Sequence, residues 1–381
     1  MEMIKSIGVW AKGNVKEIAI MALASVLCIY HLVTTIERIP TMEHRSIHLL
    51  LVLILTFLIY PLSRKQQNKI TKAIDGVLLG LSIIGVGYVV LYWPILMDRC
   101  SNPAPLDLVL GVITIAVILE ATRRTVGPML PILAVIFLAY AWFGRYIPGY
   151  FGHPGFAFER IIGFTYQTLE GIFGLILGVS AVYISIFTIF GGFLEATGIS
   201  EFFSDLALAA FGKSRGGASK ASVITSGFLG MVCGSSTAAA IMTHDLMKHS
   251  MQHEGYDKET LAAFYSAAGT GAIIMPPVMG AVAFIMAYMA EIPYVEVCKM
   301  AILPAILYYL TLILVMDIKA RKLGLKGLPQ EKIPRITTVL KRRFHMFIPI
   351  IVLVWLLAVS YTHLRAHETS LHLVCRLLLE K

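Results

Sequence analysis

The sequence predicts an all-α polytopic integral membrane protein. The chain has 381 residues, of which 57% are hydrophobic and only 14% are charged, and its mean hydropathy is +0.77. Soluble domains are far more polar than this. Apolar runs long enough to cross a hydrocarbon core of ~30 Å recur along nearly the whole chain, so the lipid bilayer is its expected surrounding and no sizeable water-soluble domain fits between the runs.

Other classes of protein are disfavoured by the cysteines and by the distribution of charge. The five cysteines show neither the spacing of a disulfide scaffold nor that of a zinc site, so we expect no transition metal and no cofactor. The formal charge of +9 does not indicate a nucleic-acid partner, because the basic residues concentrate in loops between apolar runs, where they set orientation. The first run follows three lysines like a signal sequence, but no cleavage pattern follows it, and we expect a retained span.

About nine spans are expected, together with one further apolar stretch at 217–247. The predicted spans are 18–35, 47–62, 74–96, 106–121, 126–143, 171–195, 259–290, 295–317 and 344–360.

The basic residues predict that the N-terminus is cytoplasmic. Lysines and arginines at 63–72, at 123–124 and at 213–220 fall at alternate turns and are assigned to the cytoplasm. The basic connection 317–344 should lie on the same side. If 217–247 crossed the membrane once, that connection would be outside, so the segment is predicted to be a re-entrant hairpin that enters and leaves on one side.

The centre of this segment has the composition of an ion site. Two legs of about a dozen residues reach roughly 18 Å, which places Gly234, Ser235, Ser236 and Thr237 near the middle of the bilayer. Non-helical backbone at that depth is tolerated only where it is buried in protein or lines a wet cavity, and transporters bind ions in this way. The alternative is that these small residues form a face for close helix packing.

The next apolar stretch contains a second interruption. Gly269, Thr270 and Gly271 are followed by Pro276 and Pro277, and then by Gly280. Two adjacent prolines remove two backbone donors, so a discontinuous helix is expected over 259–290, although a proline kink without a ligand is the alternative. Carbonyl and hydroxyl oxygens without a carboxylate suit a hard monovalent cation, and we expect sodium.

The same residues carry a family resemblance. The segments LDLVLGVITIAVILEATRRTVG, LEGIFGLILGVSAVY, GMVCGSSTAAA and GTGAIIMPPVMGAVAFIMA closely resemble the fused membrane permease of TRAP transporters, the tripartite ATP-independent periplasmic transporters, of the type that works with TAXI-class binding proteins. The resemblance covers roughly residues 45–358. It implies a bacterial inner-membrane permease, not an enzyme, in which a periplasmic binding protein delivers an organic acid and an ion gradient drives an elevator movement.

The resemblance also implies a division of the chain and a set of site residues. Residues 1–100 correspond to a small scaffold subunit of the family, and 101–358 to the first part of the large subunit, which is built from two inverted repeats. One sodium site is implied at the hairpin tip and at the helix break, by Ser235, Ser236, Thr237, Gly271, Ile274 and Pro276. Only one such tip and one such break are found, so the chain by itself is expected not to transport.

The last residues differ from the rest in composition. Residues 359–381 resemble a tail that recurs on unrelated translations as a sequencing artefact, and we interpret them as non-native. The three histidines of this tail follow no metal-site spacing.

Two other classes of function are open at this stage. An intramembrane protease would need a GxSG or GxGD motif, and GSST and GTGA each lack one required residue. A non-transporting scaffold or channel subunit is the other alternative, since the four N-terminal spans lack internal breaks. His244 and Asp245 could form a proton relay, but they are better explained as interfacial residues.

Overall fold

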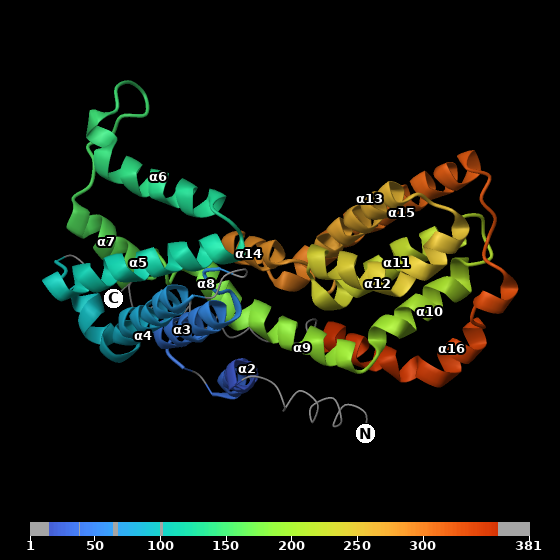
Figure 1. The fold of residues 1–381 in the computed structure, drawn as a ribbon, viewed down its shortest axis with the longest axis horizontal. Coiled ribbons are helices and arrows are strands. Elements are labelled where there is room, and N and C mark those ends of the chain that lie inside the picture. The colour runs from blue at the N-terminus through green and yellow to red at the C-terminus, as the bar shows by residue number, and fades with distance from the viewer. Residues whose placement is uncertain (1–14, 38, 64–67, 100–101, 357–381) are drawn as a thin grey trace, which may run out of the picture. The chain divides into compact units, whose positions relative to one another are not determined.

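The computed structural model describes residues 15–37, 39–63, 68–99 and 102–356, and it is all-helical over these ranges (Figure 1). Seven of the described helices are long and apolar enough to cross a membrane: Lys16–Ile36, Thr41–Ile59, Lys69–Asp98, Pro105–Thr125, Met129–Tyr146, Leu175–Ala196 and Tyr294–Lys322. The predicted class, an all-α polytopic membrane protein, is confirmed. The boundary expected near residue 100 stays a prediction, and the tail 359–381 lies outside the described residues.

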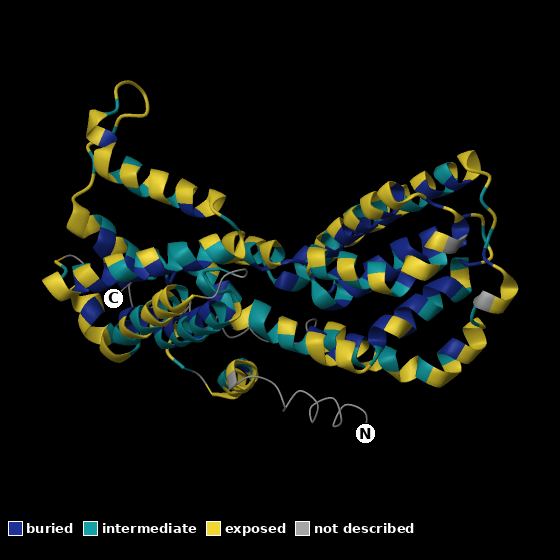
Figure 2. Cartoon of the chain, viewed as in Figure 1, coloured by how far each residue is buried: buried dark blue, intermediate teal, exposed yellow. Residues whose placement is uncertain are grey.

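The chain divides into two compact units, 1–185 and 186–381. The first unit contains α2 (Val15–Ile36), α3 (Thr41–Ile59), α4 (Lys69–Asp98), α5 (Pro105–Thr125), α6 (Met129–Phe143), η1 (Gly144–Tyr146), α7 (Phe158–Gln167), α8 (Leu175–Val179) and the π-helical turn η2 (Ser180–Ile184). Its core joins α3, α4 and α5 through residues such as Leu53, Val86 and Val117. Most of α6 is exposed, as expected of a helix that faces lipid (Figure 2).

A charge cluster joins the ends of three segments of this unit. Arg124 lies 2.6 Å from Asp75 and 2.7 Å from Glu120, and it donates to the carbonyl oxygen of Tyr60. Its side chain is only 3% exposed. Because a buried guanidinium needs several acceptors, this arrangement fixes α5 against α4 and against the end of α3.

The second unit contains the segments that the sequence singles out. Its elements are α9 (Ser185–Ala196), α10 (Ile199–Phe211), α11 (Gly217–Cys233), α12 (Ser236–Glu254), α13 (Lys258–Thr270), η3 (Gly271–Ile274), α14 (Ala281–Met289), α15 (Tyr294–Lys322), η4 (Gln330–Lys332), α16 (Ile336–Arg343) and η5 (Phe344–Phe347), followed by helix at 348–356. Small residues on α11 and methionines on α12 share one core with Tyr265 of α13 and Tyr309 of α15.

The stretch at 217–247 forms a helical hairpin, as predicted, but its legs are longer than expected. The helices α11 and α12 have 17 and 19 residues, or roughly 25 and 28 Å at 1.5 Å per residue. The second leg continues to Glu254 because no helix-breaking residue precedes Gly255. The non-helical part of the tip is shorter than expected, since it consists of Gly234 and Ser235 alone.

The predicted span 259–290 is discontinuous, which confirms the expected break. It consists of α13, the 3₁₀ turn η3, an irregular segment at 275–280, and α14. The peptide bond between Pro276 and Pro277 is cis. Of the span expected at 344–360, the described part comprises η5 and the helix at 348–356.

A candidate ion site at a hairpin tip and a helix break

The turn at the hairpin tip is built from one glycine and one capping serine. Gly234 ends α11 in the left-handed region with φ of +57°, a conformation that L side chains rarely adopt. Ser235 is extended, and its hydroxyl accepts a hydrogen bond from the Ala238 amide at 3.4 Å. Ser236 and Thr237 are therefore the first helical residues of α12, where backbone amides point away from the helix.

The tip touches the helix break. A Cβ atom placed on Gly234 would lie 2.1 Å from the carbonyl oxygen of Met279, and one placed on Gly269 would lie 2.6 Å from the carbonyl oxygen of Ser236. Glycine at these two positions therefore allows backbone to approach backbone. In this respect the structure brings together the two interruptions that the sequence predicts, although they lie about forty residues apart.

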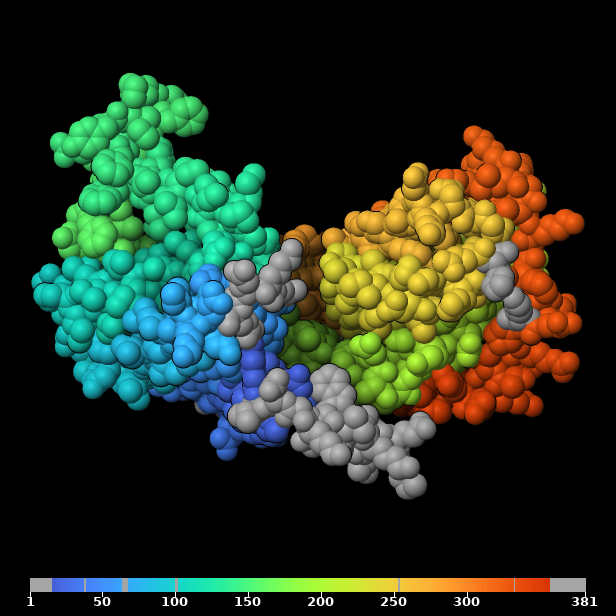
Figure 3. Space-filling model, in the orientation of Figure 1, coloured from blue at the N-terminus to red at the C-terminus, as the bar shows by residue number. Residues whose placement is uncertain are grey.

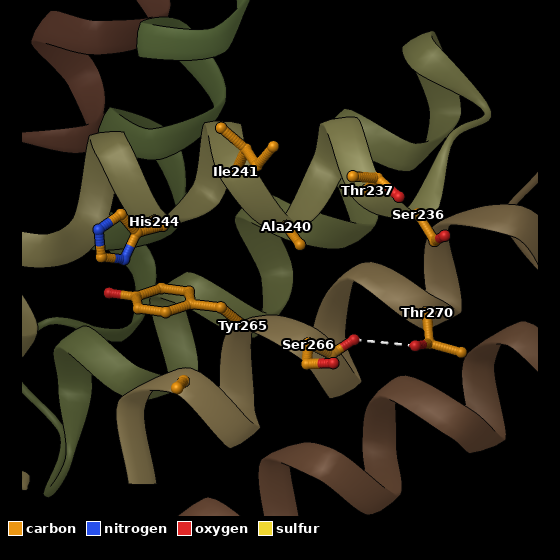
Figure 4. A pocket seen from close by; sticks show the side chains of 9 residues that line it. Ser236, Thr237, Ala240, Ile241, His244, Tyr265, Ser266 and Thr270 are labelled. Carbon is orange, nitrogen blue, oxygen red and sulfur yellow. Dashed lines mark hydrogen bonds between the residues drawn. The ribbon is translucent and has the colours of Figure 1, made fainter. Parts of the chain in front are cut away.

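Hydroxyl groups from both sides line an open pocket of about 410 Å³ between α12 and α13 (Figure 4). The hydroxyl-bearing residues Ser236 and Thr237 lie on one wall, and Ser266 and Thr270 on the other. The Thr270 hydroxyl donates to the Ser266 carbonyl oxygen at 2.8 Å. In the space-filling view the yellow and gold residues of α12 and α13 form one continuous surface (Figure 3).

The predicted site residues divide between this pocket and its surroundings. Ser236, Thr237 and Thr270 line the pocket, whereas Ile274 lines a second, apolar pocket beside Pro304 and Tyr308 of α15. Of the remaining predicted residues, Gly234 and Gly269 make the backbone contacts between tip and break, and Ser235 caps α12. Gly271 lies against Tyr308 and Tyr309, Gly280 lies against Ile273, and Pro276 and Pro277 belong to the irregular segment between η3 and α14.

Three tyrosines of α15 contact the break, although the sequence alone does not single them out. Tyr308 and Tyr309 donate to the carbonyl oxygens of Ala267 and Ala268, at 2.6 and 3.1 Å, in the last turn of α13. Tyr294 donates to the carbonyl oxygens of Pro277 and Val278. A helix end and a proline-rich segment have few amide donors for their carbonyl oxygens, and these hydroxyls add donors there, although the Ala267 carbonyl oxygen also accepts from the Gly271 amide. Their signal in the sequence is a spacing of 14 residues between Tyr294 and Tyr308, which is close to four helical turns.

Two sets of polar contacts close the other end of the hairpin. The Glu254 carboxylate, at the end of α12, accepts hydrogen bonds from the Ala218 and Ser219 amides at the start of α11, at 2.6 and 3.3 Å. Burial raises the pKa of Glu254 above its usual range, against the lowering effect of those amides. Lys220 of α11 lies 2.7 Å from Asp317 of α15. The base of the hairpin is therefore tied both to itself and to α15.

His244 lies on the pocket wall, and Asp245 is exposed. The ring of His244 meets the ring of Tyr265 edge to face, with centroids 5.0 Å apart. The two residues thus have different surroundings, and only His244 faces the pocket.

The fold defines a multi-pass helical membrane protein whose second unit pairs a helical hairpin with a broken helix. The family model described as "Tripartite ATP-independent periplasmic transporter, DctM component" matches residues 113–379. The chain belongs to this family. No curated protein matches it.

Membership of the family establishes the general role of the chain. It is a membrane permease component of a TRAP transporter, located in the bacterial inner membrane, and such transporters work with a periplasmic substrate-binding protein. The family is one of permeases and not of enzymes, which sets the intramembrane protease aside.

Proposed function

We propose that the chain is part of a sodium-driven permease that imports an organic acid delivered by a TAXI-type periplasmic binding protein. In this proposal one sodium site lies where the hairpin tip meets the helix break. The contact of Gly234 with the Met279 carbonyl oxygen is the single observation that carries it, because it places two interrupted helices and their backbone oxygens at one point.

The chemistry of the residues at this point favours a monovalent cation. Pro276 and Pro277 contribute carbonyl oxygens but no amide donors, so the segment has more acceptors than donors. Serine and threonine hydroxyls face the adjoining pocket, and no carboxylate is among its lining residues. Neutral oxygen ligands suit sodium better than a divalent metal. Proton coupling would require a titratable ligand, and His244 on the pocket wall is the group that would supply it.

The proposed orientation places the N-terminus and the hairpin base in the cytoplasm. It is supported by the basic residues at the base, where Lys220 and Arg215 both approach Asp317, at 2.7 and 3.9 Å. Basic residues beside spans are retained on the cytoplasmic side. Neither α11 nor α12 is among the helices that are both long and apolar enough to span, in agreement with a hairpin that returns to the side from which it enters.

Sodium binding can be tested on the purified chain without knowledge of the substrate. We expect the unfolding temperature to rise with NaCl and not with equimolar KCl or choline chloride, since a ligand that binds the native state stabilises it by mass action. The double variant Ser235→Ala with Ser236→Ala should lose this sodium-specific rise. The matched control is Ser250→Ala on the same helix, which lies outside the pocket and should keep it.

Transport is tested in a permease that contains both repeats of the family. The same double variant should abolish sodium-driven uptake while the protein still inserts into the membrane. Unchanged uptake by an inserted double variant would reject the assignment of the site.

A further inference from the structure

A cluster of histidines in the first unit lies apart from the proposed ion site. His31 of α2 and His48 of α3 are hydrogen-bonded between Nε2 and Nδ1 at 2.9 Å, and both side chains are buried. The Nε2 atom of His48 also lies 3.2 Å from the hydroxyl of Ser180, the first residue of the π-helical turn. Nearby, the hydroxyl of Tyr30 lies 3.1 Å from Nδ1 of His44.

This cluster is the principal buried attachment of α2. Over residues 16–36, His31 alone is buried, and every other side chain of the helix is exposed or partly exposed. A first span that packs mainly through one imidazole is unusual, because apolar side chains normally fill that role. Interhelical hydrogen bonds contribute about 1 kcal/mol each within a membrane, so few such bonds decide whether α2 stays in place.

The surroundings of the cluster favour neutral imidazoles. The Nδ1 atom of His31 is buried and has no hydrogen-bond partner among the described residues, so a proton added there finds no acceptor. Arg45 is the neighbour of His44 on α3, and it donates to the Phe173 carbonyl oxygen at 2.8 Å. Its positive charge is therefore held close to the imidazole of His44.

The opposing negative charge is small. On α3, Glu43 is the acidic residue beside Tyr30 and His44, and it is partly exposed. The residues 175–184, which pack against α3, contribute no group that titrates between pH about 4 and about 9, because Tyr183 is their one ionisable residue. Glu37, which follows α2, is exposed. Among the described residues no carboxylate is hydrogen-bonded to the imidazoles, so a second positive charge on the rings is not paired there.

We propose that Tyr30, His31, His44 and His48 form a pH-sensitive anchor, which holds α2 on the first unit while the imidazoles are neutral and releases it on acidification. Protonation of both His31 and His48 makes all their ring nitrogens donors and removes the bond between them. The released helix takes up protons near the ordinary histidine pKa of about 6.5, whereas the docked state excludes them. The docked state is consequently favoured above this pH, and is lost as the pH falls below it.

The position of the cluster determines which side of the membrane the anchor faces. His31 lies five residues before the end of α2, and His44 lies three residues after the start of α3. Both are therefore near the same end of the helix pair. In the orientation proposed above this end faces the periplasm, where the pH follows the environment. Release of α2 does not itself depend on that orientation, nor on sodium binding.

Distances between two spin labels test the anchor in the full chain. The labels are placed at Ile18 of α2 and Ile84 of α4, which are 46% and 57% exposed, after replacement of the five cysteines of the chain. We expect one narrow distance distribution at about pH 7.5. At about pH 5 the ratio of docked to released chain should fall at least tenfold, since each histidine that must stay neutral contributes up to about tenfold per pH unit.

Variants separate the cluster from other titrating groups. His31→Leu with His48→Leu replaces both bonding partners by apolar groups and should stay docked at both pH values. The control His249→Gln removes an exposed histidine of α12 and should behave like the parent chain. A parent distribution that is the same at both pH values would overturn the proposal, and so would release of the double variant on acidification. If the double variant does not fold, the distance distributions of the parent chain at the two pH values alone test the proposal.

Discussion

Gly234 is the residue at which the hairpin tip is most sensitive to substitution. It combines a positive φ with backbone contact to Met279, so both the conformation and the space exclude a side chain. The sequence predicts a break here from the run of small polar residues, and glycine is the residue of that run suited to the left-handed conformation. The contact with Met279 could not be predicted, because it depends on a segment distant in the sequence.

Substitution of this residue should both destabilise the chain and displace the tip. We expect Gly234→Ala to lower the free energy of unfolding by at least about 1–3 kcal/mol and to remove the sodium-dependent rise in unfolding temperature. The control is Gly192→Ala in α9, where a Cβ atom would meet nothing within 4 Å. Because alanine favours the helix more than glycine does, this variant should be more stable than its parent by up to about 1 kcal/mol. Thermal unfolding of both variants, in NaCl and in KCl, measures the effects. A Gly234→Ala protein as stable and as sodium-responsive as its parent would contradict the assigned contact.

Tyr294 supports the helix break through its hydroxyl group. It is 1% exposed, and its hydroxyl is the donor shared by two carbonyl oxygens of the break. Tyr294→Phe should cost about 1–3 kcal/mol of unfolding free energy, because it removes the hydroxyl donor of the Val278 carbonyl oxygen and leaves the Pro277 carbonyl oxygen with the weak Cys298 thiol donor at 3.6 Å. Tyr288→Phe, at a site 62% exposed on α14, should change stability by less than about 0.5 kcal/mol. Chemical or thermal unfolding of the two variants measures the difference. Equal stability of Tyr294→Phe and Tyr288→Phe would contradict the role assigned to the Tyr294 hydroxyl.

At the scale of elements, the sequence predicts which helices are interrupted better than it predicts what supports them. Pro276 and Pro277 forbid a regular helix by covalent structure, so the break is a local property and could be predicted. The three α15 tyrosines act only through contacts with a different helix, and their own segment reads as an ordinary span. The buried histidines of α2 and α3 were missed for the same reason, since each appears alone within its apolar run.

Leg length was also mispredicted for a physical reason. The apolar pattern of the hairpin fades after Met247, which suggests an end, but α12 continues to Glu254 through polar residues that do not break a helix. Helical turns made of polar residues leave no apolar periodicity in the sequence.

The base of the hairpin should respond to pH through Glu254. A carboxyl whose pKa is raised in the folded state stabilises that state while it is protonated, and its contribution falls as the pH rises from about 4.3 through the raised value. We expect the unfolding temperature of the parent chain to fall over this range relative to Glu254→Gln, whose side chain does not titrate. Parallel melting curves at several pH values give the comparison. A constant difference between the two proteins would show that Glu254 titrates as it does in water.

At the scale of the whole molecule, the seven described helices that could span do not alone determine topology. The number of times that the hairpin and the broken helix each cross the membrane must also be known. The distribution of basic residues between the two sides indicates that number. The sequence therefore predicts sidedness from charge, while the fold contributes the observation that α11 and α12 pair with each other along their length (Figure 1).

Sidedness can be measured with single cysteines in a cysteine-free chain. Lys326→Cys, in the basic connection after α15, should react with a membrane-impermeant thiol reagent only from the cytoplasmic side. Tyr150→Cys, at a loop position that is 99% exposed after α6, should react only from the periplasm. Periplasmic labelling at position 326 would show that the segment 217–247 crosses the membrane once, and it would contradict the proposed position of the sodium site.

The π-helical turn at Ser180–Ile184 carries a consequence for how this chain tolerates length changes. A π turn holds one residue more than the α-helical ladder around it, so deleting one residue within 181–184 would restore a regular ladder and keep the lipid-facing stripe on either side in phase. The same deletion in the middle of α15 would rotate everything beyond it by about 100°. Deletion scanning should therefore find one permissive window inside an otherwise intolerant span.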